Sequence, residues 1–181
     1  DGVDASILRS DGYKEYSIKL DKYFEYGDKI RKKLINIRDQ VMMADDLKFH
    51  SNEIQSLERE ITLFHANVVN EIIKISKIEV DLIGFHGQTI FHDPKKKVSK
   101  QLGDGKLLSQ LTKKLVVYDF RQNDLKNGGQ GAPLVPIYHK LLVETFKEEG
   151  KVKLPITILN IGGISNTTSI NENYKMTSMD I

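Results

Sequence analysis

Short apolar segments alternate with helical stretches from residue 80 onward, and this alternation constrains the fold more than any other feature. The apolar segments are residues 80–85, 115–118 and 156–161, and glycine-containing turns follow them. Helices are predicted between them, from about Lys106 to Lys113 and from about Pro133 to Lys147. Apolar runs of this length are typical of inner strands covered on both faces. The alternation therefore predicts an α/β fold with a covered sheet.

The earlier part of the chain has a different pattern. Residues 3–8 and 16–20 alternate partly and flank Asp11-Gly12, which is a strong hairpin signal. From Asp28 onward the apolar residues recur at helical spacing, and a second, longer helix starts near Ser51. We therefore expect an antiparallel strand pair followed by a helical portion over about residues 27–77.

Composition and charge exclude several classes of function. Of the 181 residues, 27 are Lys or Arg and 25 are Asp or Glu, so the net charge of +2 does not favour nucleic acid as a partner. With 0 Cys the chain has no disulfide, no thiolate zinc site and no cysteine nucleophile, which fits a reducing compartment. No apolar run approaches the roughly 18 to 20 residues that span a bilayer, and the start has no secretory signal pattern. We expect a cytoplasmic protein with no membrane partner.

Polar residues follow two of the predicted strands, where open α/β sheets bind ligands. After the first strand, His86, Gln88 and Thr89 offer the donors and acceptors that recognise sugar hydroxyls. After the second, Asp119 can position a sugar or magnesium, and Arg121 can bind a carboxylate or phosphate. Structural roles explain the same residues: a hydrogen-bonded core histidine in the first turn, and an ion pair between Asp119 and Arg121 in the second.

Two glycine-rich turns are suited to anions. Residues 127–136 hold three glycines beside the start of a helix. Gly162 and Gly163 follow an apolar strand and precede another, so their N–H groups can contact a nucleotide phosphate, although a plain hairpin has the same pattern. The chain contains no P-loop motif, no Gly-x-Gly-x-x-Gly and no Gly-x-Ser-x-Gly, which excludes those phosphate sites and a serine nucleophile elbow within it.

Together, and in this order, the polar segments resemble the anhydro-N-acetylmuramic acid kinases, a bacterial family of the sugar kinase, Hsp70 and actin superfamily. The matching phrases are Gly84-Phe-His-Gly-Gln-Thr-Ile90, Gln101-Leu-Gly-Asp104, Val117-Tyr-Asp-Phe-Arg121, Gly128-Gly-Gln-Gly-Ala-Pro-Leu-Val-Pro136 and Asn160-Ile-Gly-Gly-Ile-Ser-Asn166. Asp1-Gly-Val-Asp-Ala5 is similar to the end of the family's opening phosphate turn, and Met179-Asp-Ile181 to the start of its Asp-Thr-Gly-Pro-Gly-Asn motif.

The resemblance implies a mixed-sheet, actin-like (ribonuclease H-like) ATPase fold. Residues 1–181 would form a truncated N-terminal domain of a sugar kinase, with a helical insertion and the start of the second lobe. In the reaction it implies, ATP with Mg²⁺ phosphorylates O6 of 1,6-anhydro-N-acetylmuramic acid while water opens the anhydro bridge. The product is N-acetylmuramic acid 6-phosphate, an intermediate of cell-wall recycling. The resemblance also implies that the full-length protein is a homodimer.

The resemblance assigns each site residue of the family to a position of this sequence. Its general base corresponds to Asp180. Its sugar site corresponds to His86, Gln88, Thr89, Asp119 and Arg121. Its nucleotide phosphate sites correspond to Asp1, Gly2, Asp4, Gly162 and Gly163. No metal ligand is assigned.

The chain departs from the family's pattern at both ends. The opening Met-Ser-Gly-Thr-Ser-Leu is missing, and the chain stops before Gly-Pro-Gly-Asn and the adenosine-binding half. We therefore expect the 181 residues alone to be inactive. The alternative function is a non-catalytic truncated fragment that at most binds sugar. A polypeptide-binding ATPase of the actin or Hsp70 type would share the fold but leaves the sugar-facing phrases unexplained.

Overall fold

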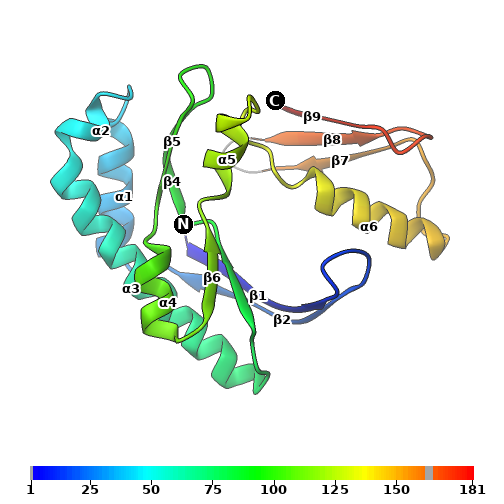
Figure 1. Ribbon diagram of the computed structural model, residues 1–181, viewed down its shortest axis with the longest axis horizontal. Helices are drawn as coiled ribbons and strands as arrows, with labels where there is room; N and C mark the ends of the chain where they lie inside the picture. Colours follow the sequence, from blue (N-terminus) through cyan, green and yellow to red (C-terminus); the bar gives the residue numbers. More distant parts are fainter. Residues whose placement is uncertain (1, 162–164) are drawn as a thin grey trace. The chain divides into compact units, whose positions relative to one another are not determined.

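The computed structural model describes residues 2–161 and 165–181, which form two compact units (Figure 1). Unit 1 comprises residues 1–129 and unit 2 residues 130–181. Unit 1 contains β1 (Gly2–Ser10), β2 (Tyr16–Glu25), α1 (Asp28–Gln40), α2 (Asp46–Phe49), α3 (Ser51–Ser76), β3 (Leu82–Phe85), β4 (Gln88–Asp93), β5 (Val98–Leu102), α4 (Gly105–Thr112), β6 (Leu115–Tyr118) and α5 (Phe120–Lys126). Unit 2 contains α6 (Pro136–Glu148), β7 (Ile156–Asn160), β8 (Asn166–Ile170) and β9 (Met176–Asp180). The predicted mixture of helices and strands is confirmed.

Three two-stranded sheets form the strand part of unit 1. The pairs β1–β2 and β4–β5 are antiparallel, whereas β3–β6 is parallel. The covered inner sheet predicted from the apolar runs is wrong for β3 and β6. One face of this pair packs on α3 and α4, but the other exposes Leu82 (54%) and Leu115 (71%). Side chains alternate between the two faces of a strand, so one helical layer covers only half of them.

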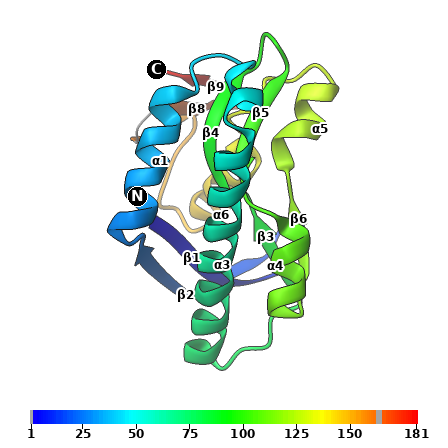
Figure 2. The same cartoon turned by 90° about the vertical axis from the view of Figure 1, so that its left-hand side faces the viewer.

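Helix α3 connects the helical layer to the strands. Its N-terminal half packs against α1, β4 and β5 in one apolar cluster, whose members include Leu34, Ile37, Ile54, Leu57, Ile61, Ile90 and Leu102. Further along the helix, Ala66 packs with Phe85 and Leu108 in a second cluster. Figure 2 shows α3 running past the strands of unit 1 with α1 and α4 on either side of it.

One hydrogen-bonding side chain of α3, that of Thr62, holds the start of α4. The Thr62 hydroxyl donates to the Glu58 carbonyl (2.7 Å) and accepts the Asp104 N–H (3.0 Å). The Asp104 carboxylate in turn accepts the Leu107 N–H (3.0 Å) and so caps α4. Thr62 is fully buried, so its hydroxyl is an acceptor held inside the packed unit.

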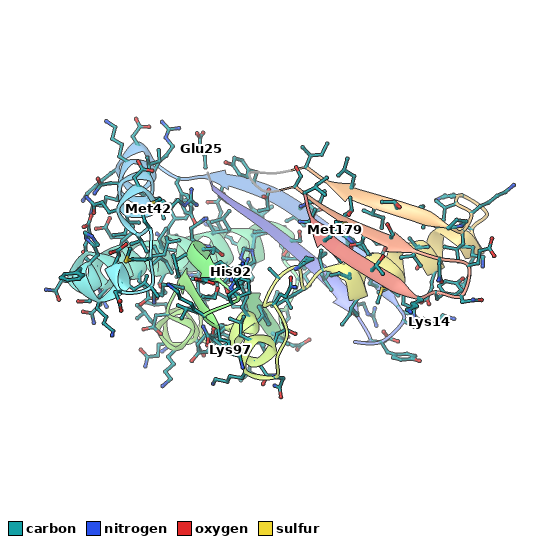
Figure 3. All side chains as sticks on the ribbon, turned by 90° about the horizontal axis from the view of Figure 1, so that it is seen from above. Lys14, Glu25, Met42, His92, Lys97 and Met179 are labelled. Carbon is teal, nitrogen blue, oxygen red and sulfur yellow. The ribbon has the colours of Figure 1, made fainter. Side chains whose placement is uncertain are left out.

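The hairpin β4–β5 and helix α5 were not predicted. Both strands of the hairpin are mostly half-buried, and their polar residues interrupt the alternation that identifies a strand. Figure 3 labels His92 in β4 and Lys97 in the connecting turn. Helix α5 has 7 residues, too few for a helical period to be recognised, and it replaces the turn expected after Asp119.

In unit 2, α6 accompanies a three-stranded antiparallel sheet of order β7-β8-β9. Near the start of the helix, His139 contacts the Thr168 hydroxyl through Nδ1 (2.8 Å). Near its end, Lys147 Nζ donates to the Tyr174 hydroxyl (3.1 Å), beyond the far end of β8. The two contacts orient α6 along β8. Within the described parts of the two units, no helix is long and apolar enough to cross a membrane.

The Thr62 contact gives a test of how α3 and α4 are joined. Replacing Thr62 with Val keeps the side chain's shape but removes the acceptor for the Asp104 N–H, so the free energy of unfolding should fall by about 1–3 kcal/mol. Thr112 is the matched control, because it is also buried and its hydroxyl donates to its own helix at Leu108 O (2.8 Å). Urea unfolding should give a smaller loss for Thr112→Val, and equal losses would contradict the role of Thr62.

A second test concerns the buried His65. Its Nδ1 donates to the Ile61 carbonyl (2.8 Å), and burial lowers the pKa of the ring from its ordinary 6.5. The unfolded chain therefore binds more protons below about pH 6.5, and the free energy of unfolding should decrease as pH falls, by up to about 1.36 kcal/mol per pH unit for this residue. Burial lowers the pKa of His139 as well, so it adds to the slope. A His65→Gln variant should show a shallower slope; an unchanged slope would rule out this contribution.

Candidate functional site

A cavity of about 240 Å³ lies in unit 1 at the carboxyl ends of β3 and β6. The paired strands end at Phe85 and Tyr118, which lie opposite each other. The next residues, His86 and Asp119, both line the cavity. The remaining lining residues are Glu58, Phe85, Gly87, Ser99, Lys100, Gln101, Gly103, Tyr118 and Gln122. Parallel pairing therefore brings together two predicted site residues that are far apart in the sequence.

The backbone at Gly87 turns the chain from β3 into β4. Its φ of +67° lies in the left-handed region, and a Cβ atom there would collide with the Leu102 carbonyl oxygen. A larger residue would therefore displace β5, which forms one wall of the cavity. The glycine-containing turn predicted after the apolar segment 80–85 is confirmed at Gly87.

Asp119 has an unusual backbone conformation and a carboxyl group whose pKa is raised. Its φ of 61° is left-handed, which directs the chain from β6 into α5 and which Asp tolerates better than most residues. The residue is exposed overall, yet desolvation of the carboxyl raises its pKa, while Lys126 and Lys100 act to lower it. The positive charges of these two lysines therefore oppose the effect of burial on the pKa of Asp119.

Hydrogen bonds fix the walls of the cavity. Glu58 Oε1 of α3 accepts from Lys100 Nζ (2.7 Å) and from the Gly103 N–H (3.2 Å), which anchors the end of β5. Gln122 Nε2 of α5 donates to the Ser99 carbonyl (2.9 Å). Helices on both sides of β5 thus hold it in place.

Sequence reasoning missed several cavity residues. Gln101 lies in one of the family-like phrases and donates through Nε2 to Thr89 Oγ1 (3.2 Å), so that phrase was the available signal. Glu58 and Gln122 lie on helices with no local motif, and only the tertiary structure brings them to the cavity.

Three predicted sugar-site residues lie beside the cavity and do not line it. Gln88 and Thr89 begin β4, although a turn was expected there. The Thr89 hydroxyl accepts a hydrogen bond from Gln101, which lines the cavity. Arg121 is half-buried in the first turn of α5.

A second cavity of unit 1, about 170 Å³, is bounded by β1, α3 and β3. Asp4 and His86 are both among its lining residues, so His86 borders both cavities. Gly2 lies in β1, where a Cβ atom would be 2.5 Å from both the Phe24 carbonyl oxygen and the Tyr23 hydroxyl, so the neighbouring β2 leaves no room for a side chain. Asp1 lies outside the described residues.

The predicted residues of unit 2 are less completely described. Gly162 and Gly163 lie outside the described residues. The backbone of Asp180 ends β9, where it is opposite Asn166 of β8. Among the residues that the structure describes, no group of three or more His, Asp or Glu is arranged to hold a metal ion.

Comparisons with known proteins agree with these motifs. The sequence profile of the family described as anhydro-N-acetylmuramic acid kinase matches residues 1–181. A protein of Pelagibacter ubique named anhydro-N-acetylmuramic acid kinase is 53% identical over 183 residues, covering 100% of this chain and 48% of the relative. Relatives with the same name from Brucella canis and Rhodopseudomonas palustris are 36% and 35% identical, covering 99% and 94% of this chain and 48% and 46% of their own lengths.

The chain thus spans about half the length of the curated relatives it matches. The match nevertheless extends over every segment that carries the site motifs, from residue 1 to residue 181. The chain belongs to the anhydro-N-acetylmuramic acid kinase family.

Proposed function

We propose that the protein carrying this chain is an ATP-dependent kinase that converts 1,6-anhydro-N-acetylmuramic acid to N-acetylmuramic acid 6-phosphate. The observation that carries the proposal is the polar cavity at the ends of β3 and β6, lined by His86 and Asp119 within a chain of this family. The actin-like fold, the domain assignment, the homodimer, the cytoplasmic location and the absence of nucleic-acid and membrane partners are parts of the same proposal.

The cavity residues fit a sugar chemically. The carboxylate of Asp119 can accept hydrogen bonds from hydroxyl groups, and His86 and Gln101 offer both donors and acceptors. Gln88, Thr89 and Arg121 are proposed as sugar-site residues that act from the edge of the cavity. Asp4 and Gly2, with Asp1, Gly162 and Gly163, are proposed for the nucleotide phosphates.

The chemical steps require one general base. The carboxylate of Asp180 would remove a proton from water, whose oxygen forms a bond to C1 as the C1–O6 bond breaks. The freed O6 accepts the γ-phosphoryl group, and ADP leaves. Mg²⁺ bound to ATP would neutralise phosphate charge. We assign it no protein ligand, because the described residues include no cluster for a metal.

Asp119→Asn tests the sugar site in the full-length protein that carries this chain. The amide keeps the shape but loses the charge that strengthens hydrogen bonds from sugar hydroxyls, so the sugar dissociation constant should rise about tenfold or more. ATP affinity should not change. Asp45→Asn, an exposed substitution before α2, is the control. Calorimetric titration measures both ligands; equal sugar affinity in the two variants would remove Asp119 from the site.

Asp180→Asn tests the general base in the same protein. The amide can still hydrogen-bond water but cannot accept its proton, so kcat should fall by about 10² to 10⁴-fold while sugar and ATP still bind. Asp119→Asn should instead affect mainly sugar affinity. Turnover and dissociation constants of both variants decide between the residues. If the Asp180 variant turns over normally while the Asp119 variant binds sugar but has no activity, Asp119 and not Asp180 is the general base.

A further inference from the structure

A buried histidine of α3 lines the second cavity of unit 1. His65 is only 9% exposed, yet it is among the residues that bound this cavity of about 170 Å³. The rings of Tyr26 and Phe85 pack around it, with their centroids 6.2 and 4.9 Å from that of His65. His86, which follows Phe85, lines the same cavity and also the first one. The packing of α3 on β3 therefore brings two imidazole rings to one cavity.

One ring nitrogen of His65 is already used by its own helix. Nδ1 lies 2.8 Å from the Ile61 carbonyl oxygen, which can only accept a hydrogen bond, so Nδ1 carries the proton. Burial lowers the pKa of the ring and favours its neutral form, in which the other nitrogen, Nε2, is an acceptor. Nε2 has no hydrogen-bond partner among the residues that the structure describes. The cavity is therefore lined by a buried acceptor that lacks a donor.

The donor that fits this acceptor best is His86. The other polar side chains of the cavity are Asp4, Ser6 and His86, and an ionised carboxylate such as that of Asp4 donates nothing. His86 is the side chain whose positive charge acts to lower the pKa of His65, so the two rings are near each other. The two described rings form no direct hydrogen bond, but the cavity is polar and large enough for a water molecule that bonds to both.

We propose that His65 is a positioning residue for His86. A water molecule in the second cavity accepts a hydrogen bond from one ring nitrogen of His86 and donates one to Nε2 of His65. This holds the His86 proton on the side of the second cavity, so its other nitrogen accepts a hydrogen bond from a sugar hydroxyl in the first cavity. The inference rests on the proposed function, because it takes the first cavity as the sugar site. It gives His65 no contact with the sugar.

Sugar affinity in the full-length protein that carries this chain tests the role of His65. His65→Phe keeps an aromatic ring but removes Nε2, so the dissociation constant of 1,6-anhydro-N-acetylmuramic acid should rise about fivefold to tenfold, while that of ATP should not change. His65→Gln can place a carbonyl oxygen near the position of Nε2 and should restore most of the affinity. Ser6→Ala, which removes the other donor of the same cavity, is the control and should bind the sugar as the wild type does. Calorimetric titration measures both ligands.

A double-mutant cycle shows whether His65 acts through His86. His65→Phe should weaken sugar binding in the wild-type background and have no further effect in a His86→Ala background. Equal effects of His65→Phe in the two backgrounds would contradict the link between the histidines.

The tautomer of His86 gives a readout that does not need the sugar. In protein labelled with nitrogen-15 histidine, the ring shifts at mildly alkaline pH distinguish a protonated nitrogen from one with a free lone pair, and the signals lost in His86→Ala identify His86. We expect one tautomer in the wild type and a mixture in His65→Phe. A mixture already present in the wild type overturns the inference, even if every variant at position 65 fails to fold.

The outcomes separate this inference from the proposed function. A wild-type protein that does not bind the anhydro sugar overturns both. A wild-type protein that binds it, together with an unchanged sugar dissociation constant in a folded His65→Phe variant, overturns the inference alone. If His65 only supported the fold, His65→Phe would weaken sugar and ATP binding together and leave the tautomer of His86 unchanged. Thermal unfolding of each variant shows whether the fold is retained.

Discussion

Helix α3 is the element on which unit 1 depends, because one helix packs against α1, the β4–β5 hairpin, β3 and α4. Its apolar face packs on α1 and on the β4–β5 hairpin, and further along on β3 and α4. Two of its polar side chains, Glu58 and Thr62, accept the N–H groups of Gly103 and Asp104 at the end of β5. These groups lie between strand and helix, where no ladder can satisfy them. The helix therefore both stabilises the core and fixes one wall of the cavity.

The position of the cavity follows from this arrangement. Parallel pairing of β3 and β6 places His86 and Asp119 at the same edge, and β5 and α5 close the sides. Several polar lining groups already form hydrogen bonds within the protein: Lys100 pairs with Glu58, and Gln122 donates to the Ser99 carbonyl. Asp119 differs, since its carboxyl is partly desolvated and its backbone is held in a left-handed conformation. We propose it as a lining group that exchanges water for a ligand hydroxyl.

Unit 2 uses strand register for a similar purpose. Its three antiparallel strands pair Asn160 with Asn166, and Asn166 with Asp180, at one end of the sheet. A shift of one residue in β9 would change which residue of β8 lies opposite Asp180. The position of the proposed base thus depends on pairing along the whole strand, including the hydrophobic pair Ile170 and Met176 at its other end.

The sequence by itself determined the elements whose signal is local, and the family through its motifs. The hairpin at Asp11-Gly12, the long periodicity of α3 and the presence of α4 and α6 were predicted because turn chemistry and helical spacing act over a few residues. Only the tertiary structure decided the rest. The β4–β5 hairpin depends on cross-strand pairing, α5 is too short to show a period, and the exposed face of β3–β6 follows from having a single helical layer. Glu58 reaches Lys100 and Gly103 across more than forty residues, and Asn166 meets Asp180 only through strand register, so no local pattern could identify either contact.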